Sequence, residues 1–337
     1  MSTQCLRDAR GFATVTGNAS AGAAKRATAT SGASELINDG VVATSSVLLI
    51  GSFFWVPAYL YHVWRNKCKT RRRKALFLAC LVAFLAGPMP VTRRIARLSV
   101  WNRFWRYFSG SFVGEMDACR GKQSLFCLVP HGVFPFGVAL ASLGRANETV
   151  FNAAKPVCAS IMLRTPIIGN ILRMIGAVGA SRDTMDDALK QGHSLSLAPG
   201  GIGEMFLDRE AGKEFALLRG HKGFVRRAMA HGVPLVPVYV FGNSQTFKRV
   251  PLPAALESLS RLLKASLVLF WGRWGLPIPF KVPLTFAFGE TLDIEKNLSP
   301  SDEQVDAVHA RFCEALADVF DRYKGAHGWG DTKLELR

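Results

Sequence analysis

The sequence predicts an α/β protein in which an N-terminal membrane-embedded helical segment precedes a domain with a central mixed sheet. The first observation behind this prediction is an uncharged apolar stretch at 41–64. The second is the change, after about residue 120, to short apolar runs that alternate with helical patterns, as in proteins that pack helices on a sheet. We therefore divide the chain into a disordered tail (1–40), a membrane-embedded segment (41–91), a basic amphipathic interfacial segment (92–119), the α/β domain (120–325) and a short tail (326–337).

The charge balance indicates an acidic partner. The 337 residues include 42 Lys and Arg against 25 Asp and Glu, a formal net charge of +17. Twelve of the basic residues fall in 65–106, which has no Asp or Glu and lies beside the apolar stretch. An anionic membrane lipid explains both features, whereas nucleic acid explains only the charge, so we expect no nucleic-acid partner. The seven cysteines never form a Cys-x-x-Cys pair, which argues against a disulfide framework and a cysteine zinc site.

The first forty residues are mostly Ala, Ser, Thr and Gly without apolar periodicity, which predicts a disordered tail. Their Ser, Ala and Arg content also fits an organelle transit peptide, although Asp8, Glu35 and Asp39 argue against that reading. The 24 residues of 41–64 would form a helix of about 36 Å, enough to cross a hydrocarbon core of about 30 Å.

The second apolar run, 75–91, has seventeen residues and contains Gly87, Pro88 and Pro90, so it fits a second span or a re-entrant element. Between the runs, 65–74 holds seven basic residues, which the positive-inside rule keeps in the cytosol. We therefore favour one span followed by a re-entrant element, with the N-terminal tail in the lumen. Arginines alternate with apolar residues over 93–106, the pattern of a basic helix lying on lipid headgroups.

The α/β domain begins with an apolar strand at 124–129. Further strands are predicted at 156–163, 193–198, 234–241 and 283–288, and helices at 166–176, 183–191, 223–231 and 253–270. The last helix begins near Ser299, an N-cap followed by Pro300 at the first helical position. Its apolar face repeats at helical spacing: Val305, Val308, Phe312, Leu316, Val319 and Tyr323.

Two segments that follow predicted strands carry candidate chemistry. Pro130 and Gly132 flank His131 at the end of 124–129, where open α/β sheets place their sites. An imidazole titrates near neutrality and can take a proton from an alcohol, although a lone histidine is more often structural. The segment 199–204 follows 193–198, and its glycines would let backbone N–H groups approach a substrate oxygen, with Glu204 as an acid at the same sheet edge. The alternative is a solvent-exposed turn.

A third segment, 218–227, places basic residues at the start of a helix, where they oppose the helix dipole. This local conflict indicates an anionic ligand, and a solvated basic face is the alternative.

Together, these segments resemble the type-2 diacylglycerol acyltransferase family, which includes monoacylglycerol and wax-alcohol acyltransferases. The family pattern His-Pro-His-Gly corresponds to 129–132, and its Gly-Gly-x-x-Glu loop to 200–204. Its Arg-x-Pro and Ser-Arg-Asp-Thr segments match 164–166 and 181–184, and its longest block matches 222–242. Gly275-x-Pro277-Ile278 matches a late family segment. The motifs occur in the family order over about 120–325.

Three positions depart from the family pattern. The first histidine of the tetrad is Val129, the usual arginine before Lys-Gly-Phe is His221, and the usual glutamate after Phe-Gly is Asn243. These departures leave acyl transfer intact as an expectation and put the acceptor in doubt.

The resemblance implies an integral membrane O-acyltransferase that moves a fatty acyl group from acyl-CoA to diacylglycerol and forms triacylglycerol. It implies His131 as general base, the Gly200 and Gly201 amides as donors to the carbonyl oxygen, and Glu204 as a group that orients His131 or the acceptor. Of the cations, Lys222 matches the family best as a partner for the coenzyme A phosphates. The full set of substrate-binding residues expected on this basis is Pro130, Gly132, Arg164, Ser181, Arg182, Pro199, Gly200, Gly201, Arg219, Lys222, Gly223 and Phe224.

We expect no metal and no cofactor, with acyl-CoA as co-substrate. The expected location is the endoplasmic reticulum membrane, with the catalytic domain in the cytosol, and a lipid droplet is also possible. A plastid membrane is the less favoured location. Another lipid alcohol as acceptor stays open, namely monoacylglycerol, a wax alcohol or phytol, as does a homo-oligomer. A lysophospholipid acyltransferase would show His-x-x-x-x-Asp, but Phe136 stands five residues after His131. A catalytically degenerate lipid-binding protein is the remaining alternative.

Overall fold

The computed structural model describes residues 4–7, 13–16, 32–87, 90–207, 210–251 and 268–337. Within them, the central sheet has nine strands in the order β1-β2-β3-β12-β9-β4-β7-β5-β6. β4 runs parallel to β9 and β7, and β12 runs antiparallel to β9, so the predicted mixed sheet is confirmed. These strands are β1 (Gln4–Arg7), β2 (Ala13–Thr16), β3 (Ser111–Gly114), β4 (Leu125–Val129), β5 (Lys155–Cys158), β6 (Val178–Gly179), β7 (Leu195–Leu197), β9 (Leu235–Phe241) and β12 (Thr285–Phe288).

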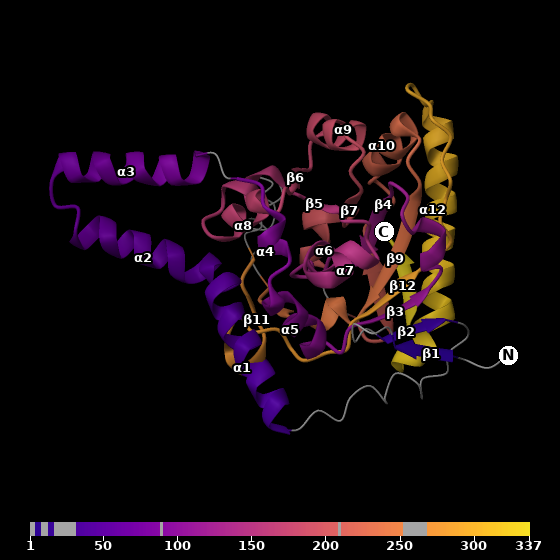
Figure 1. The fold of residues 1–337 in the computed structure, drawn as a ribbon, viewed down its shortest axis with the longest axis horizontal. Helices are drawn as coiled ribbons and strands as arrows, with labels where there is room; N and C mark the ends of the chain where they lie inside the picture. The colour runs from indigo at the N-terminus through magenta and orange to yellow at the C-terminus, as the bar shows by residue number, and fades with distance from the viewer. Residues whose placement is uncertain (1–3, 8–12, 17–31, 88–89, 208–209, 252–267) are drawn as a thin grey trace.

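Helices cover both faces of this sheet (Figure 1). Strand β4 shows why, because Phe126 and Leu128 belong to one buried cluster while Leu125, Cys127 and Val129 belong to the other. A continuous apolar run therefore buries alternate side chains on opposite faces. One face carries α5 (Ser99–Tyr107), α6 (Phe136–Ser142) and α7 (Gly144–Thr149), and the other carries α9 (Arg182–Lys190), α10 (Gly223–His231) and α12 (Asp302–Tyr323).

Helix α12 begins two residues later than expected. Its N-cap is Ser301, which accepts the N–H of Gln304, while the Gln304 side chain accepts the N–H of Ser301. This reciprocal capping box satisfies two backbone donors, which a cap at Ser299 would not do. The predicted apolar face packs on the sheet: Val305, Phe312, Leu316 and Val319 are buried, and Val308 and Tyr323 pack beside them.

Two element predictions in the domain need correction. The strand expected at 156–163 ends at Cys158, because its neighbour β6 offers only Val178 and Gly179 as partners, and residues Ser160–Arg164 form a 3-10 turn. Most of the helix expected at 253–270 lies outside the described residues. Its last residue belongs to a strand, β11 (Phe270–Trp271), which pairs with β10 (Lys248–Arg249).

Both ends of the chain are more ordered than the predicted tails. Helix α1 (Gly32–Leu49) starts inside the predicted N-terminal tail and lies on the domain. Its Asn38 donates to the carbonyl of Arg103, and its Asp39 pairs with Arg273 at 3.2 Å. These contacts are long-range, so the composition of 1–40 could not reveal them. At the other end, β13 (Lys333–Leu336) pairs with β8 (Lys213–Ala216) inside the predicted C-terminal tail.

The segment 92–119 is part of the folded domain. It forms α4 (Arg93–Ala96), α5 and β3. The aromatic side chains of α5, Trp101, Phe104 and Trp105, are buried in the core instead of facing headgroups. The single helix expected over 93–106 is divided into α4 and α5, and the apolar face of α5 covers the sheet.

The stretch 41–64 is not one helix. It bends by 49° between α1 and α2 (Ser52–Asn66). The bend lies at Gly51, where a Cβ would sit 2.2 Å from the carbonyl oxygen of Val47 and 3.1 Å from Cγ of Pro277. Among the described residues, no helix alone has the length and hydropathy to cross a membrane, although this bent pair reaches both together. We call the junction from Leu49 to Phe54, with its bend at Gly51, the elbow.

Helices α2 and α3 (Arg71–Ala86) form a hairpin that projects from the domain (Figure 1). Near its tip, the rings of Trp64 and Phe77 lie 5.8 Å apart, and Lys74 lies over the Trp64 ring. At its base, Arg173 of α8 (Ile168–Met174) donates to the carbonyl of Gly87 at 2.6 Å. Both ends of the hairpin thus return to the domain.

Candidate active site

Three neighbouring parallel strands deliver polar residues to one edge of the sheet. The sheet order is β9-β4-β7, and the loops that follow these strands contain Asn243, His131 and Glu204 respectively. Parallel strands place their carboxyl ends together, so segments far apart in the sequence meet here. The structure confirms that the two segments predicted at 130–132 and 199–204 come together.

The His131 ring has one nitrogen engaged. Its Nδ1 lies 2.7 Å from the carbonyl oxygen of Gly132. Because a carbonyl only accepts, Nδ1 carries the proton, and Nε2 is left with a free lone pair. The apolar surroundings lower the pKa of His131 below its ordinary value by desolvation, and the hydrogen bond to Gly132 opposes this only partly. The ring is therefore a neutral base at neutral pH.

Glu204 contacts the backbone of the His131 loop. Its Oε2 accepts the N–H of His131 at 2.5 Å, and its Oε1 accepts the N–H of Leu217 at 2.8 Å. Burial raises the pKa of Glu204 to about 7, which the two backbone donors oppose and the charge of Glu214 reinforces. Gly200 makes room for the carboxylate, because a Cβ there would lie 2.2 Å from Oε1. This contact with the His131 backbone is compatible with the predicted role of orienting His131.

The predicted pair of amide donors is reduced to one candidate. The N–H of Gly201 donates to the carbonyl of Ala198 at 3.0 Å, so it is not available to a substrate oxygen in this structure. The prediction for Gly201 is wrong in this respect, because the chain turns into a 3-10 helix there, with Gly201 at φ +53°. Gly200 stays a candidate.

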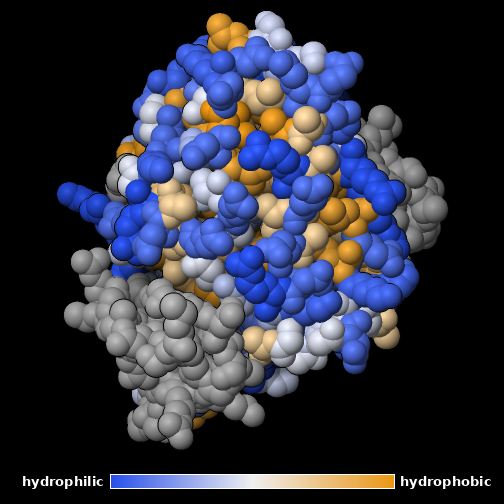
Figure 2. All heavy atoms as spheres, turned by 90° about the vertical axis from the view of Figure 1, so that its right-hand side faces the viewer, coloured by the Kyte–Doolittle hydropathy of each residue, from blue (hydrophilic) through white to orange (hydrophobic). Residues whose placement is uncertain are grey.

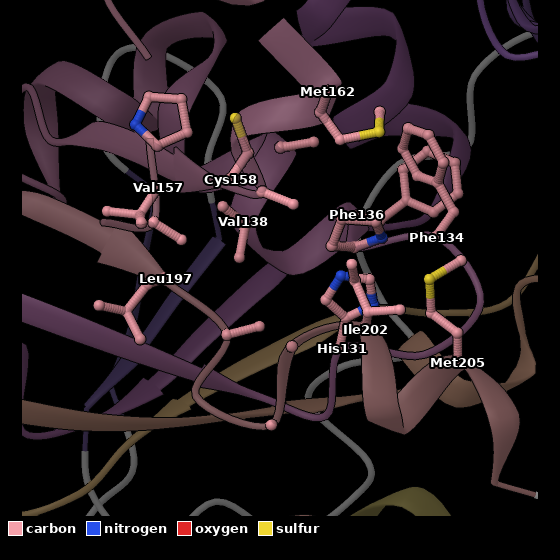
Figure 3. A pocket seen from close by; sticks show the side chains of 18 of the residues that line it. His131, Phe134, Phe136, Val138, Val157, Cys158, Met162, Leu197, Ile202 and Met205 are labelled. Atoms are coloured by element: carbon pink, nitrogen blue, oxygen red, sulfur yellow. The ribbon is translucent and has the colours of Figure 1, made fainter. Parts of the chain in front are cut away.

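His131 borders a cavity of about 1710 Å³ with mostly apolar walls (Figure 3). The ring lies beside Phe134, Phe136, Ile202 and Met205, and the cavity continues towards Val157 and Cys158. Pockets for small molecules are usually about 300–1,000 Å³, so this one suits a larger apolar ligand. Burial raises the pKa of the Cys158 thiol to about 12, so this thiol stays protonated at neutral pH.

Two sets of wall residues mark where the cavity meets the surface. One is apolar and combines the exposed side chains of Phe54 and Leu269 with the half-buried Leu49. The other lies at the starts of two helices and contains Ser181, His221 and neighbouring glycines. A long ligand would thus have an apolar and a polar end.

Comparisons with known proteins show to which family this chain belongs. The diacylglycerol acyltransferase family model matches residues 76–337. The chain belongs to the diacylglycerol acyltransferase family. It is 29% identical over 303 residues to human diacylglycerol O-acyltransferase 2, covering 83% of this chain and 74% of the relative. It is 30% identical to the cattle 2-acylglycerol O-acyltransferase 1, covering 69% of this chain and 76% of that protein.

A solved structure is similar at a lower level. It is the 1-acyl-sn-glycerophosphate acyltransferase of Thermotoga maritima, at 13% identity and a TM-score of 0.42, covering 85% of this chain and 96% of that one. The resemblance inferred from the ordered motifs is confirmed by the family match, and the chain is an acyltransferase.

The basic residues expected to bind coenzyme A are mostly paired within this acyltransferase. Lys222 contacts Asp306 of α12 at 2.5 Å, and Arg226 pairs with Asp302 on the same helix. Arg227, with Asp186, belongs to a pair that is largely buried. Among the arginines expected to bind substrate, Arg164, Arg182 and Arg219 are exposed and form no ion pair within the described part of the chain.

The other predicted residues divide between two cavities. Those that line the large cavity are His131, Ser181, Pro199, Gly200, Gly201, Lys222, Gly223 and Phe224. Behind the His131 loop lies a smaller cavity of about 320 Å³, which is bordered by Pro130, Gly132 and Glu204. These three residues therefore shape the loop that carries His131 and lie on its far side from the large cavity.

The sequence did not reveal that Leu49 and Phe54 line the cavity, or that Asn243 contacts the His131 loop. Asn243 was noted only as a departure from the family pattern, although its position directly after an apolar strand was the same signal that singled out His131.

Proposed function

We propose that this acyltransferase moves a fatty acyl group from acyl-CoA to the free hydroxyl of diacylglycerol, with His131 as general base. The observation that carries the proposal is the neutral imidazole on the wall of a large apolar cavity, with Nδ1 engaged by Gly132 and Nε2 available. No metal or cofactor is required, because a general base and the thioester supply the chemistry.

The reaction balances without another reactant. The hydroxyl oxygen attacks the thioester carbonyl carbon while Nε2 of His131 takes the hydroxyl proton. The tetrahedral intermediate collapses, the C–S bond breaks, and the imidazolium returns the proton to the coenzyme A thiolate. The ester and coenzyme A leave, and His131 is neutral again. General-base help of this kind contributes about 10²–10⁴-fold.

The two ends of the cavity suit the two substrates. The apolar end is continuous with a series of aromatic rings in which Phe54 of the elbow lies 5.3 Å from Phe270, and Phe270 lies 4.9 Å from Phe247. Phe247 in turn stacks on Phe136 beside the His131 loop. We assign this end to the acyl chains of the lipid acceptor, and the end at Ser181 and His221 to coenzyme A.

The coenzyme A phosphates would meet Arg219 first, because it is exposed beside the polar end of the cavity. Lys222 would join only by leaving Asp306, which costs little at a half-exposed pair. Arg164 and Arg182 complete the proposed set. Phosphates at this place would also face the first N–H groups of α10.

The hairpin is proposed to lie in the cytosolic leaflet of the endoplasmic reticulum or on a lipid droplet. It exposes large apolar side chains, among them Tyr59, Leu76 and Val82, and its tip carries the seven basic residues of 65–74 that anionic lipid would bind. The opposite face of the molecule, which carries α12, is mostly hydrophilic (Figure 2). Helices α2 and α3 have 15 and 16 residues and measure about 23 Å each, which is less than the hydrocarbon core of about 30 Å. This length is why the hairpin is placed in one leaflet and not across the membrane.

This placement replaces the expected luminal tail. Because α1 is docked on the catalytic domain and both hairpin ends return there, the tail stays on the cytosolic side. The test is glycosylation in microsomes at the three sequons, Asn18, Asn147 and Asn297. None should be modified, and modification at Asn18 would restore a luminal tail.

Monoacylglycerol is the second candidate acceptor, favoured by the 30% identity to the cattle 2-acylglycerol enzyme. The experiment supplies microsomes with labelled oleoyl-CoA and, side by side, diacylglycerol, monoacylglycerol, a long-chain alcohol and phytol. We expect labelled triacylglycerol to dominate and to vanish in H131A. Product from none of the acceptors would instead indicate a degenerate lipid-binding protein.

A further inference from the structure

We propose that Asn243 is a positioning residue that holds the His131 loop from the side opposite Glu204. The inference rests on the proposed role of His131 as base, and it assigns a function to one of the three positions at which this chain departs from its family pattern.

The Asn243 side chain donates two hydrogen bonds to the loop. Its Nδ2 lies 2.8 Å from the carbonyl oxygen of Pro130 and 2.8 Å from that of His131. Both partners only accept, so the amide nitrogen and not the oxygen must face them. The side chain is 1% exposed, and its Oδ1 has no hydrogen-bond partner among the described residues. The two donated bonds are thus the polar contacts that this side chain makes within the described part of the chain.

The surrounding backbone is built to admit this amide. Gly242 has φ +84°, and a Cβ there would lie 2.3 Å from the carbonyl oxygen of Pro283, so only glycine fits before Asn243. Gly132 has φ +64°, and a Cβ there would lie 3.1 Å from Nδ2 of Asn243. Thr246 then donates its hydroxyl to the carbonyl of Asn243 at 2.8 Å, which fixes the turn.

The result is a clamp on the backbone of the base itself. Glu204 accepts the N–H of His131, and Asn243 donates to its carbonyl oxygen. The two clamp residues follow β7 and β9, the strands on either side of β4. With the main chain held on both sides and Nδ1 held by Gly132, the direction of Nε2 is set. A displacement of about 1 Å at such a group can cost about 10²-fold in rate.

The test compares three substitutions of Asn243 in the full-length enzyme in microsomes. N243D keeps the shape but removes both donors and, when ionised, turns an acceptor towards two carbonyls. N243S keeps one short donor, and N243A keeps none. We expect kcat to fall about 30-fold or more in N243D and N243A and less in N243S, with the KM for acyl-CoA and for diacylglycerol within twofold of wild type.

The matched control is S244A. Ser244 is the next residue in the same turn, but its hydroxyl donates to Glu214 at 3.0 Å and not to the His131 loop. We expect its kcat within threefold of wild type. Folding is followed by the melting temperature of each detergent-solubilised variant, so that kcat is compared only per folded enzyme.

The outcomes separate the clamp from the proposed function. If H131A is inactive while folded N243D or N243S keeps more than half of the wild-type kcat, the clamp is refuted and the base stands. A change confined to KM, with kcat unchanged, also overturns the clamp. So does a loss of kcat that follows the melting temperature and is equally large in S244A. If H131A stays active, the proposed base itself fails. The rate at which His131 is carbethoxylated gives a supporting chemical readout. We expect this rate in folded N243S to differ from that in wild type.

Discussion

Two regions that the sequence singled out for their polar residues differ in what surrounds those residues. At the ends of β4 and β7, Glu204 and the backbone of His131 satisfy one another and leave one imidazole nitrogen free. At the start of α10, Lys222 and Arg226 are instead neutralised by acids of α12, which lies some eighty residues further along the chain. On the proposed roles, the first region holds its base in place before any substrate binds, and the second would have to rearrange to receive an anion.

The difference shows what a strand end provides that a helix face does not. Loops after neighbouring parallel strands are held by the sheet, so few residues suffice to fix a side chain within them. Cations on a helix face are free to pair with any nearby acid, and half-exposed pairs exchange at a cost of about 1 kcal/mol or less. Substitutions in the first region should therefore change kcat, and those in the second should change KM.

The largest effect is expected for H131A. Loss of the base should lower kcat by about 10²-fold or more, because an alcohol is a weak nucleophile without it. Turnover with labelled oleoyl-CoA measures this in microsomes, where membrane binding should be unchanged. More than a tenth of wild-type turnover in H131A would remove His131 from its role.

A smaller loss, about tenfold in kcat, is expected for E204Q. The carboxylate offers an acceptor to each of two N–H groups, whereas the amide would turn its own donor towards one of them, at about 1–3 kcal/mol. The control is E210Q, an exposed partner of Lys213 that lines neither cavity. Equal kcat in the two variants would count against the clamp on the loop.

The basic region should respond in KM. R219Q with K222Q should raise the KM for acyl-CoA several-fold while the KM for diacylglycerol stays constant, and added salt should shrink the difference because screening weakens the wild-type contacts. Lower protein abundance with an unchanged KM would point to a structural role.

The opposite change is expected for D306N, which frees Lys222 from its ion pair. The KM for acyl-CoA should fall about twofold, in keeping with the small energy of such a pair. A rise in this KM would mean that Asp306 orients Lys222 instead of competing for it.

The smallest effect concerns pH. Because burial lowers the pKa of His131, the neutral base persists at lower pH than an ordinary histidine, and the acid limb of kcat/KM should lie below pH 6.5. The same shift means that the charged imidazole disfavours the folded state, so stability falls as the pH drops through this range. A limb near pH 7 would instead match the titration of Glu204.

Local patterns predicted most of the elements around the site and two of its three candidate loops, but not β3, β6, α6 and α7. Continuous apolar runs located β4 and β9, and the polar residues just beyond β4 and β7 located His131 and Glu204. Asn243 escaped because its role depends on β9 lying next to β4, which strand order alone decides. The partners of Lys222 escaped for a similar reason, since Asp306 is 84 residues away.

The prediction of one continuous helix over 41–64 was wrong for a different reason. The run 41–64 has the composition of a span, but nothing within it reveals that Gly51 rests on Pro277. A late family motif, Gly275-x-Pro277-Ile278, thus seats the elbow more than two hundred residues earlier in the chain. Hydropathy shows that a segment is apolar enough for a membrane, whereas contacts with distant residues determine where it bends.

The elbow also bears on how this enzyme behaves once it is extracted. Since Leu49 and Phe54 belong both to the cavity wall and to the helices that lead into the hairpin, a surfactant that coats these helices reaches the same apolar walls as the acceptor. Alkyl tails should then occupy the cavity and compete with diacylglycerol, more strongly as the tail lengthens. Apparent acceptor affinity measured in micelles would report on the surfactant as much as on the protein, and reconstitution into phospholipid should restore it.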